Sequence, residues 1–138
     1  MRALCLELQD AHRQCVALLL WRLWTLDQKR RISRETVNDA VEAAKAWNDQ
    51  VLIPLRAVRI GLKPSRPLID DDAARLSLRD QIQTAELASE RLLLDALERL
   101  APAPGEVEEG SLDAMETMIQ VWGRPAPTAL LGRLVVAP

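Results

Sequence analysis

Few residues of this chain can do nucleophilic chemistry. Its 138 residues include one histidine, His12, and two cysteines, Cys5 and Cys15, with no Tyr or Phe. On one helix His12 and Cys15 would be neighbours at i and i+3, an arrangement in which histidine can activate a thiolate. No Asp or Asn is placed to orient the histidine, and Cys15 opens the most apolar run of the chain. We therefore expect a buried structural thiol, a surface histidine and no catalytic residue.

Metal ligands are equally sparse. His12 and the two cysteines offer at most three soft ligands without CxxC spacing, so a zinc site is not expected. Glu86 and Glu90 stand four residues apart and could share a metal, as in carboxylate bundles. Those bundles also use Glu-x-x-His motifs, and the histidine here is in no such motif. We expect these carboxylates on a solvated helix face, and neither a metal nor a cofactor.

The cysteines and the apolar runs indicate the compartment. Cys5 and Cys15 are ten residues apart on what reads as one helix, about 15 Å and beyond disulfide reach. Unpaired cysteines are usual in a reducing cytoplasm. Glu7 and Asp10 interrupt any signal-peptide pattern, and the run from Cys15 to Trp21 falls well short of the ~20 residues of a membrane span. We expect a cytoplasmic protein without a membrane partner.

Charge is segregated along the chain. Residues 1–69 hold 12 basic and 7 acidic residues, a net of +5, whereas residues 70–138 hold 6 and 13, a net of −7. We expect the two halves to pair internally or to be solvated, and the alternative is a polyanion such as RNA. No aromatic residue interleaves with the basic clusters for base stacking. The candidate polyanion or partner contacts are Lys29, Arg30, Arg31, Arg34, Arg56, Arg59 and Lys63.

Helical spacing dominates the first half of the chain. Residues 2–26 predict one helix with an almost wholly apolar second half, which places it at the centre of the domain. Ser33 is a plausible N-cap for a second helix. That helix carries an apolar stripe of Val37, Ala40, Val41, Ala44, Trp47 and Val51. Pro54 either kinks it or opens a new helix.

The next predicted helix runs from the acidic triplet at residues 70–72 to about residue 100. Carboxylates favour a helix N-terminus, and the following residues repeat at helical spacing. We expect one apolar face made of Leu78, Ile82, Ala85, Leu92, Leu93, Ala96, Leu97 and Leu100.

Residues 101–110, rich in Pro, Gly and Glu, predict a linker, and residues 111–138 predict an extension with a short amphipathic helix. Ser111 is placed to cap that helix and Gly123 lies just beyond its end. Met and Trp on such a helix suit docking into a groove, on the chain's own body or on a partner. The candidate docking residues are Met115, Met118, Ile119 and Trp122, and we favour docking on the chain's own body.

Several short motifs occur in an order that resembles a small all-helical bacterial family of unknown function, over about residues 3–100. They are Cys5–Asp10, Leu18–Trp21 with Leu23-Trp24, Trp47 before Pro54-Leu55-Arg56, Leu62-Lys63, and Glu86-Leu87 with Glu90-Arg91. The family tends to have Gly, Asp and Asn where this chain has Arg13, Cys15 and Ala17. The resemblance implies an all-helical fold and no established activity or site.

Together these patterns predict an all-α small helical bundle of about four main helices in residues 1–100, followed by the linker and a short helical extension. We expect a non-enzymatic module for protein–protein interaction, with a protein partner or a second copy of the chain. The alternative is an RNA- or ribosome-associated factor that uses basic residues of the N-terminal half.

Overall fold

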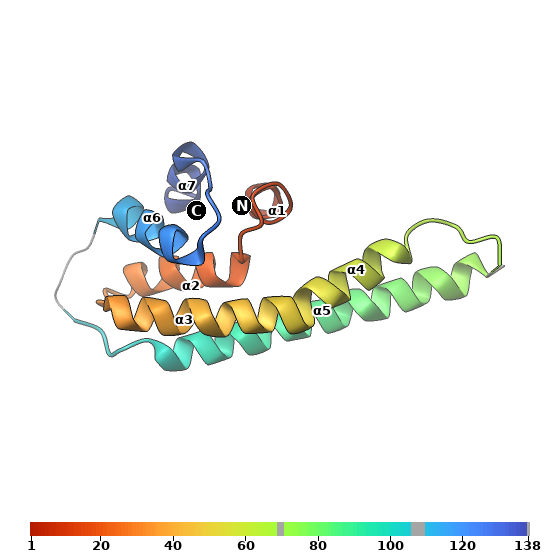
Figure 1. The fold of residues 1–138 in the computed structure, drawn as a ribbon, viewed down its shortest axis with the longest axis horizontal. Coiled ribbons are helices and arrows are strands. Elements are labelled where there is room, and N and C mark those ends of the chain that lie inside the picture. The colour runs from red at the N-terminus through yellow and green to blue at the C-terminus, as the bar shows by residue number, and fades with distance from the viewer. Residues whose placement is uncertain (69–70, 106–109, 138) are drawn as a thin grey trace.

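The computed structural model describes residues 1–68, 71–105 and 110–137, and this part of the chain contains seven α-helices and one π-helical turn (Figure 1). The predicted all-α class is confirmed. In chain order the elements are α1 (Arg2–Asp10), α2 (Val16–Asp27), α3 (Arg34–Trp47), the π-helical turn η1 (Asn48–Leu52), α4 (Ile53–Gly61), α5 (Asp72–Leu100), α6 (Ser111–Trp122) and α7 (Thr128–Val135).

The single helix predicted for residues 2–26 is wrong, because the chain breaks between α1 and α2. Arg13 adopts a left-handed backbone conformation with φ 52°, which ends the regular hydrogen-bond ladder. The N–H of Gln14 bonds the carbonyl of Leu8, and the Gln14 side chain donates to the carbonyl of Arg124 at 2.8 Å. Tertiary hydrogen bonds therefore hold a turn that local helix propensity does not predict.

Helix α3 begins as expected, with the Ser33 hydroxyl accepting the N–H of Thr36 at 3.1 Å. Pro54 does not separate α4 from α3, although proline has no N–H to donate within a helix. The π-helical turn just before it widens the helix, and α3, η1 and α4 form one continuous rod (Figure 1). The kinked-helix alternative is thus the closer of the two sequence predictions.

Helix α5 starts where the acidic residues predict, and Asp71 caps it by accepting the N–H of Ala74 at 2.8 Å. Asp70 lies outside the described residues. The predicted apolar face of α5 is wrong in part: Leu78, Leu92 and Leu100 are exposed. The face turned toward the other helices keeps Ile82, Leu93 and Leu97 of the predicted face. It also contains charged residues that the prediction left out, namely Arg75, Arg79, Glu86 and Glu90.

The C-terminal residues form two helices. Helix α6 begins at Ser111, and the cap predicted for this residue is wrong, because Gly110 occupies the N-cap position and no side chain caps the helix. Its last residue is Trp122, and Gly123 follows with a φ of 81°, the left-handed conformation that glycine adopts without strain. Helix α7 was not expected, because Pro125 and Pro127 precede it and it is short. Its buried residues Leu130, Leu131 and Leu134 recur at helical spacing.

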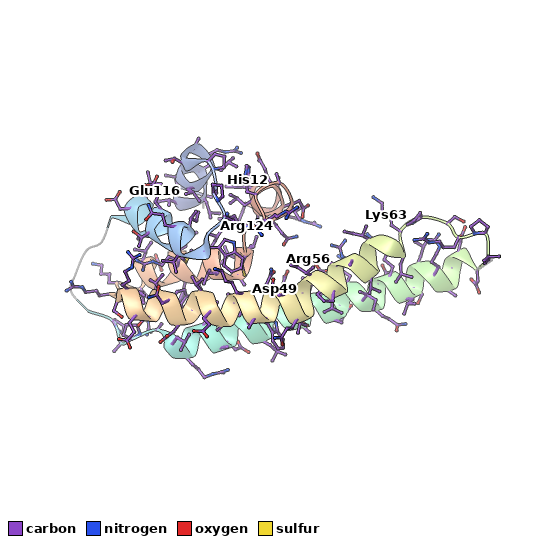
Figure 2. The ribbon with its side chains drawn as sticks, in the orientation of Figure 1. His12, Asp49, Arg56, Lys63, Glu116 and Arg124 are labelled. Carbon is purple, nitrogen blue, oxygen red and sulfur yellow. The ribbon has the colours of Figure 1, made fainter. Side chains whose placement is uncertain are left out.

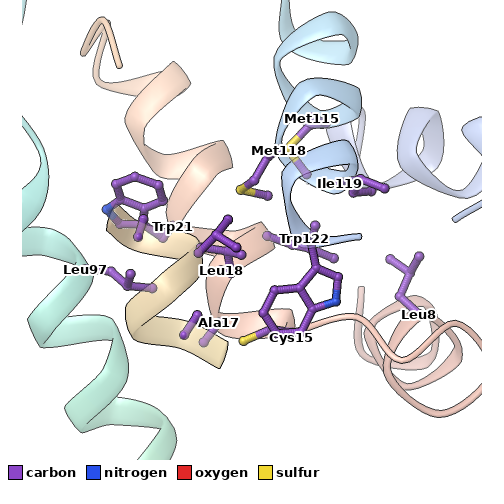
Figure 3. Close-up of a cluster of buried hydrophobic side chains, with 14 of the residues drawn as sticks. Leu8, Cys15, Ala17, Leu18, Trp21, Leu97, Met115, Met118, Ile119 and Trp122 are labelled. Atoms are coloured by element: carbon purple, nitrogen blue, oxygen red, sulfur yellow. The ribbon is translucent and has the colours of Figure 1, made fainter. Parts of the chain in front are cut away.

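One buried cluster draws on α1, α2, α3, α5, α6 and α7 (Figure 3). Trp21 and Leu18 of α2 lie at its centre, close to Leu97 of α5 and to Met115 and Met118 of α6. The central position predicted for the apolar part of the first segment is confirmed for α2. The cluster also takes members from both sides of the predicted linker.

The elements separate into two regions (Figure 1). We call residues 53–87 the arm: it comprises α4, the connection to α5 and the first half of α5. The remaining helices form the body, from which the arm projects as an antiparallel two-helix hairpin. In the described residues, no helix is long and apolar enough to cross a membrane.

Candidate interaction surface

Charged side chains lie between the two helices of the arm. Arg56 Nε donates to Glu86 Oε1 at 3.0 Å, and Arg59 Nε donates to Glu86 Oε2 at 2.6 Å. Arg56 also reaches Glu90 at 3.1 Å. Figure 2 shows Arg56 near the base of α4 and Lys63 toward its far end. Glu86 is only 7% exposed, so the solvated face predicted for this carboxylate pair is wrong: it binds arginines.

A second set of polar contacts holds the far end of the arm. Arg75 is buried, and its NH1 donates to the carbonyls of Leu62 and Lys63 at 2.6 and 2.8 Å. These carbonyls directly follow the last residue of α4, where no further turn of the helix supplies a donor. Arg75 therefore caps α4 from the neighbouring helix. Arg75 also pairs with Asp72 at 2.9 Å. That hydrogen bond, followed by the arginine charge, lowers the pKa of Asp72 from its ordinary value.

Apolar side chains lie on the outside of the arm. Of the twelve large apolar side chains exposed in the described part of the chain, seven belong to residues 53–87, although the arm is only a quarter of the chain's length. They are Ile53, Val58, Ile60, Leu68, Leu76, Leu78 and Leu87. Helix α4 has no buried residue at all. The arm thus has charges inside and leucines outside, the reverse of the body.

One face of α5 carries a continuous run of exposed residues that includes Leu78. Its members on α5 are spaced by 4, 3, 4, 3 and 4 residues, which places them on one helix face. We call this run the seam: Ala74, Leu78, Gln81, Ala85, Ala88 and Leu92. All six are exposed, and the run continues past the arm to Leu92. Leu78, Ala85 and Leu92 share helical spacing with residues that are buried, because the sequence of one helix does not show which side its neighbours cover.

The basic residues proposed as polyanion contacts are divided by the structure. Arg56 and Arg59 are paired with Glu86, in agreement with the expected internal pairing of the two halves. The Arg30 guanidinium lies 4.7 Å from the centroid of the Trp24 ring and donates to the Pro102 carbonyl at 2.7 Å. The members that remain exposed are Lys29, Arg31, Arg34 and Lys63.

The four candidate docking residues of α6 are all buried within this chain: Met115, Met118, Ile119 and Trp122. The Trp122 indole donates to the carbonyl of Arg13 at 3.1 Å. The extension therefore docks on its own body, as the sequence favoured. These side chains are covered within the chain and are not presented to a partner, which was the other alternative.

The thiols and the histidine do not form a site. His12 lies in the turn after α1 and Cys15 at the start of α2, so the helical neighbourhood assumed for them does not exist. Both cysteines are free, and burial raises the pKa of the Cys15 thiol and that of Cys5. Among the described residues there is no group of three or more His, Cys, Asp or Glu able to hold a metal.

A cleft of about 460 Å³ lies between α1 and the base of the arm. It is lined by Gln9, Asp10, Arg13, Gln14, Asn48, Ile53, Arg56 and Ile60. Its charged groups carry both signs, and Arg56 already binds two carboxylates. The cleft therefore has no concentration of one charge that would select a ligand class.

Comparison with known proteins gives one match. A family model described as "Protein of unknown function (DUF2390)" matches residues 1–97. No curated protein and no solved structure matches the chain. The matched region contains the whole arm and most of α5, whereas α6 and α7 lie outside it.

Proposed function

This chain belongs to the DUF2390 family of proteins of unknown function, and on that premise we propose that it is a non-enzymatic helical module for protein–protein interaction whose contact surface is the arm. The observation that carries the proposal is the reversed burial of the arm, with ion pairs between its helices and large apolar side chains on its outside.

The physical argument starts from hydration. Full burial of a leucine or isoleucine from water contributes roughly 1.5–3 kcal/mol, and the half-exposed side chains of the arm would contribute roughly half of this each when a partner covers them. Scattered apolar residues are normal on a protein surface, but several gathered on one projecting element mark an interaction site. A two-helix hairpin cannot cover its own flanks, so further helices from a partner are the natural cover.

Thiol chemistry supports the non-enzymatic part of the proposal. A thiolate is the nucleophilic form, and a raised pKa lowers its fraction at neutral pH. We expect alkylation of the native protein to modify Cys15 slowly and to reach full rate only in denaturant. A Cys15 that reacts faster than a free thiol at neutral pH would overturn this part.

RNA association remains the second proposal, with Lys29, Arg31 and Arg34 as its exposed cations. It is weakened by the engagement of Arg56 and Arg59 with carboxylates. If it is right, replacing Arg31 and Arg34 by Gln should weaken RNA binding and flatten its salt dependence. A parent protein that binds no RNA at low salt would exclude RNA association.

We also propose that the protein acts in the bacterial cytoplasm. The resemblance to a bacterial family and the two free cysteines support this location. A fractionation of cells into cytoplasm, periplasm and membrane tests it, with recovery in the membrane or periplasm as the contrary result.

The interaction proposal can be tested by photo-crosslinking in cells. A photoreactive phenylalanine derivative at position 78 or 60 lies on the outside of the arm, and the same residue at Asn38, exposed on α3, serves as the control. We expect discrete adducts from the two arm positions and none from position 38. Arm positions that give no adduct above the control would contradict the arm as a contact surface.

A further inference from the structure

We propose that the seam of α5 pairs with the seam of a second copy of this chain, in antiparallel orientation about a two-fold axis near Gln83. This inference rests on the proposed function and names the partner for one part of that surface, the α5 face that carries Leu78. The seam runs from Ala74 to Leu92, about 27 Å of helix, with the spacing of a coiled-coil contact.

Side-chain size favours a second copy over an unrelated helix. When two seams run antiparallel about Gln83, Leu78 of each copy faces Ala88 of the other, and Leu92 faces Ala74. Both leucines of each helix thus meet a small residue, so large and small side chains alternate across the contact. Shifting the alignment by one heptad in either direction pairs only four of the six seam residues and places a leucine opposite Gln81, Leu92 in one direction and Leu78 in the other.

The polar residues fit the same alignment. Gln81 lies close to the two-fold axis, where its amide can bond the amide of the other copy, and one polar residue in a seam specifies register. Beside the seam, Ser77 lies near Arg91 of the second copy and Thr84 lies near its own counterpart. No like charges oppose one another within the seam, whereas at each of its exposed ends Asp71 of one copy faces Asp95 of the other, where water and salt weaken the repulsion.

The position of α4 fits the same assembly. Helix α4 packs on the stripe of α5 that contains Glu86, and this stripe lies beside the seam rather than on it. Pairing two seams therefore leaves both hairpins intact and gathers four helices, the number of the common helical bundle. A contact between identical surfaces also closes at two copies, since a two-fold interface is self-complementary.

The test compares two leucines that are each 45% exposed and stand two residues apart on α5. Leu78→Lys places a charge on the seam, whereas Leu76→Lys places it outside the seam. In sedimentation of the purified full chain, we expect Leu78→Lys to weaken dimerisation by about tenfold or more and Leu76→Lys to leave it unchanged. Circular dichroism of both variants checks that the helices persist.

Orientation is tested with single cysteines in a Cys5→Ser, Cys15→Ala background. Thr84→Cys lies beside the two-fold axis and should form an interchain disulfide on oxidation. Ala74→Cys lies about 27 Å from its counterpart in the antiparallel pair and should not. Disulfides from both positions would indicate parallel pairing and overturn the proposed geometry.

A purified protein that stays monomeric at high micromolar concentration overturns the inference. The proposed function then stands or falls separately, on whether positions 78 and 60 crosslink to a different protein in cells. An equal loss of dimer in both lysine variants would likewise exclude the seam as the contact.

Discussion

The body and the arm differ in the side chains that lie between their helices. In the body, apolar side chains from six helices meet, and Trp21, Leu18 and Met118 are almost completely excluded from water. In the arm, Arg56, Arg59 and Glu86 lie between two helices while leucines face outward. The body therefore covers its own apolar side chains, whereas the arm has internal order but an uncovered apolar surface.

The largest effect is expected from a cavity in the body. Trp21→Ala should lower the free energy of unfolding by about 3–5 kcal/mol, because the indole is 1% exposed at the centre of the cluster. Leu87→Ala on the arm, where the leucine is 60% exposed, should change it by less than about 0.5 kcal/mol. Urea unfolding of both measures the contrast, and equal losses would erase the distinction between the regions.

A smaller loss is expected from the interior of the arm. Glu86→Ala leaves two arginines without their shared carboxylate, and it should destabilise the protein by about 2–3 kcal/mol, below the value for fully buried pairs because the arginines are partly exposed. Glu98→Ala, an exposed carboxylate on the same helix, is the control.

The triple replacement of Arg56, Arg59 and Glu86 by Leu sharpens that result. Removing all three charges leaves neither arginine unpaired, and the carboxylate that loses a partner, Glu90, is partly exposed, so the stability of the variant should lie close to that of the parent. If Glu86→Ala is as harmless as Glu98→Ala in thermal unfolding, the ion pairs do not organise the arm.

The third effect is a gain in stability from a substitution in the body. Lys29 has φ 50°, its N–H bonds the Leu26 carbonyl, and the N–H of Arg30 bonds the Thr25 carbonyl. This is the helix ending in which glycine is usual, so Lys29→Gly should raise stability by about 0.5–1 kcal/mol. Arg31→Gly removes a charge without relieving a left-handed backbone and should not stabilise. A lower melting temperature for Lys29→Gly would contradict the strain.

The smallest effect concerns the end of the arm. Because Arg75 lowers the pKa of Asp72 in the folded state, the stability from this pair is present above the unfolded pKa and is lost as pH falls through the lower folded value. The melting temperatures of the parent and Asp72→Asn should therefore differ at neutral pH and converge in acid. A difference independent of pH would show that the carboxylate charge plays no part. Salt should reduce the difference in melting temperature at neutral pH, since Asp72 is exposed.

The sequence alone determined the features that depend on residues within a few positions of one another. Ser33 and Asp71 cap helices through groups three residues away, and Gly123 ends α6 through its own backbone freedom. The apolar stripe of α3 and the burial of α2 follow from composition at helical spacing. The all-α class followed from the same local patterns.

Only the tertiary structure decided which face of each helix is covered. Glu86 finds its arginines 30 and 27 residues away, and the break at Arg13 is held by groups more than 100 residues further along. Leu78 and Leu92 carry the same local signal as Leu93 and Leu97, yet the first two are exposed and the last two buried. The physical reason is that helical spacing records which residues share a face, whereas burial depends on the element that packs against it.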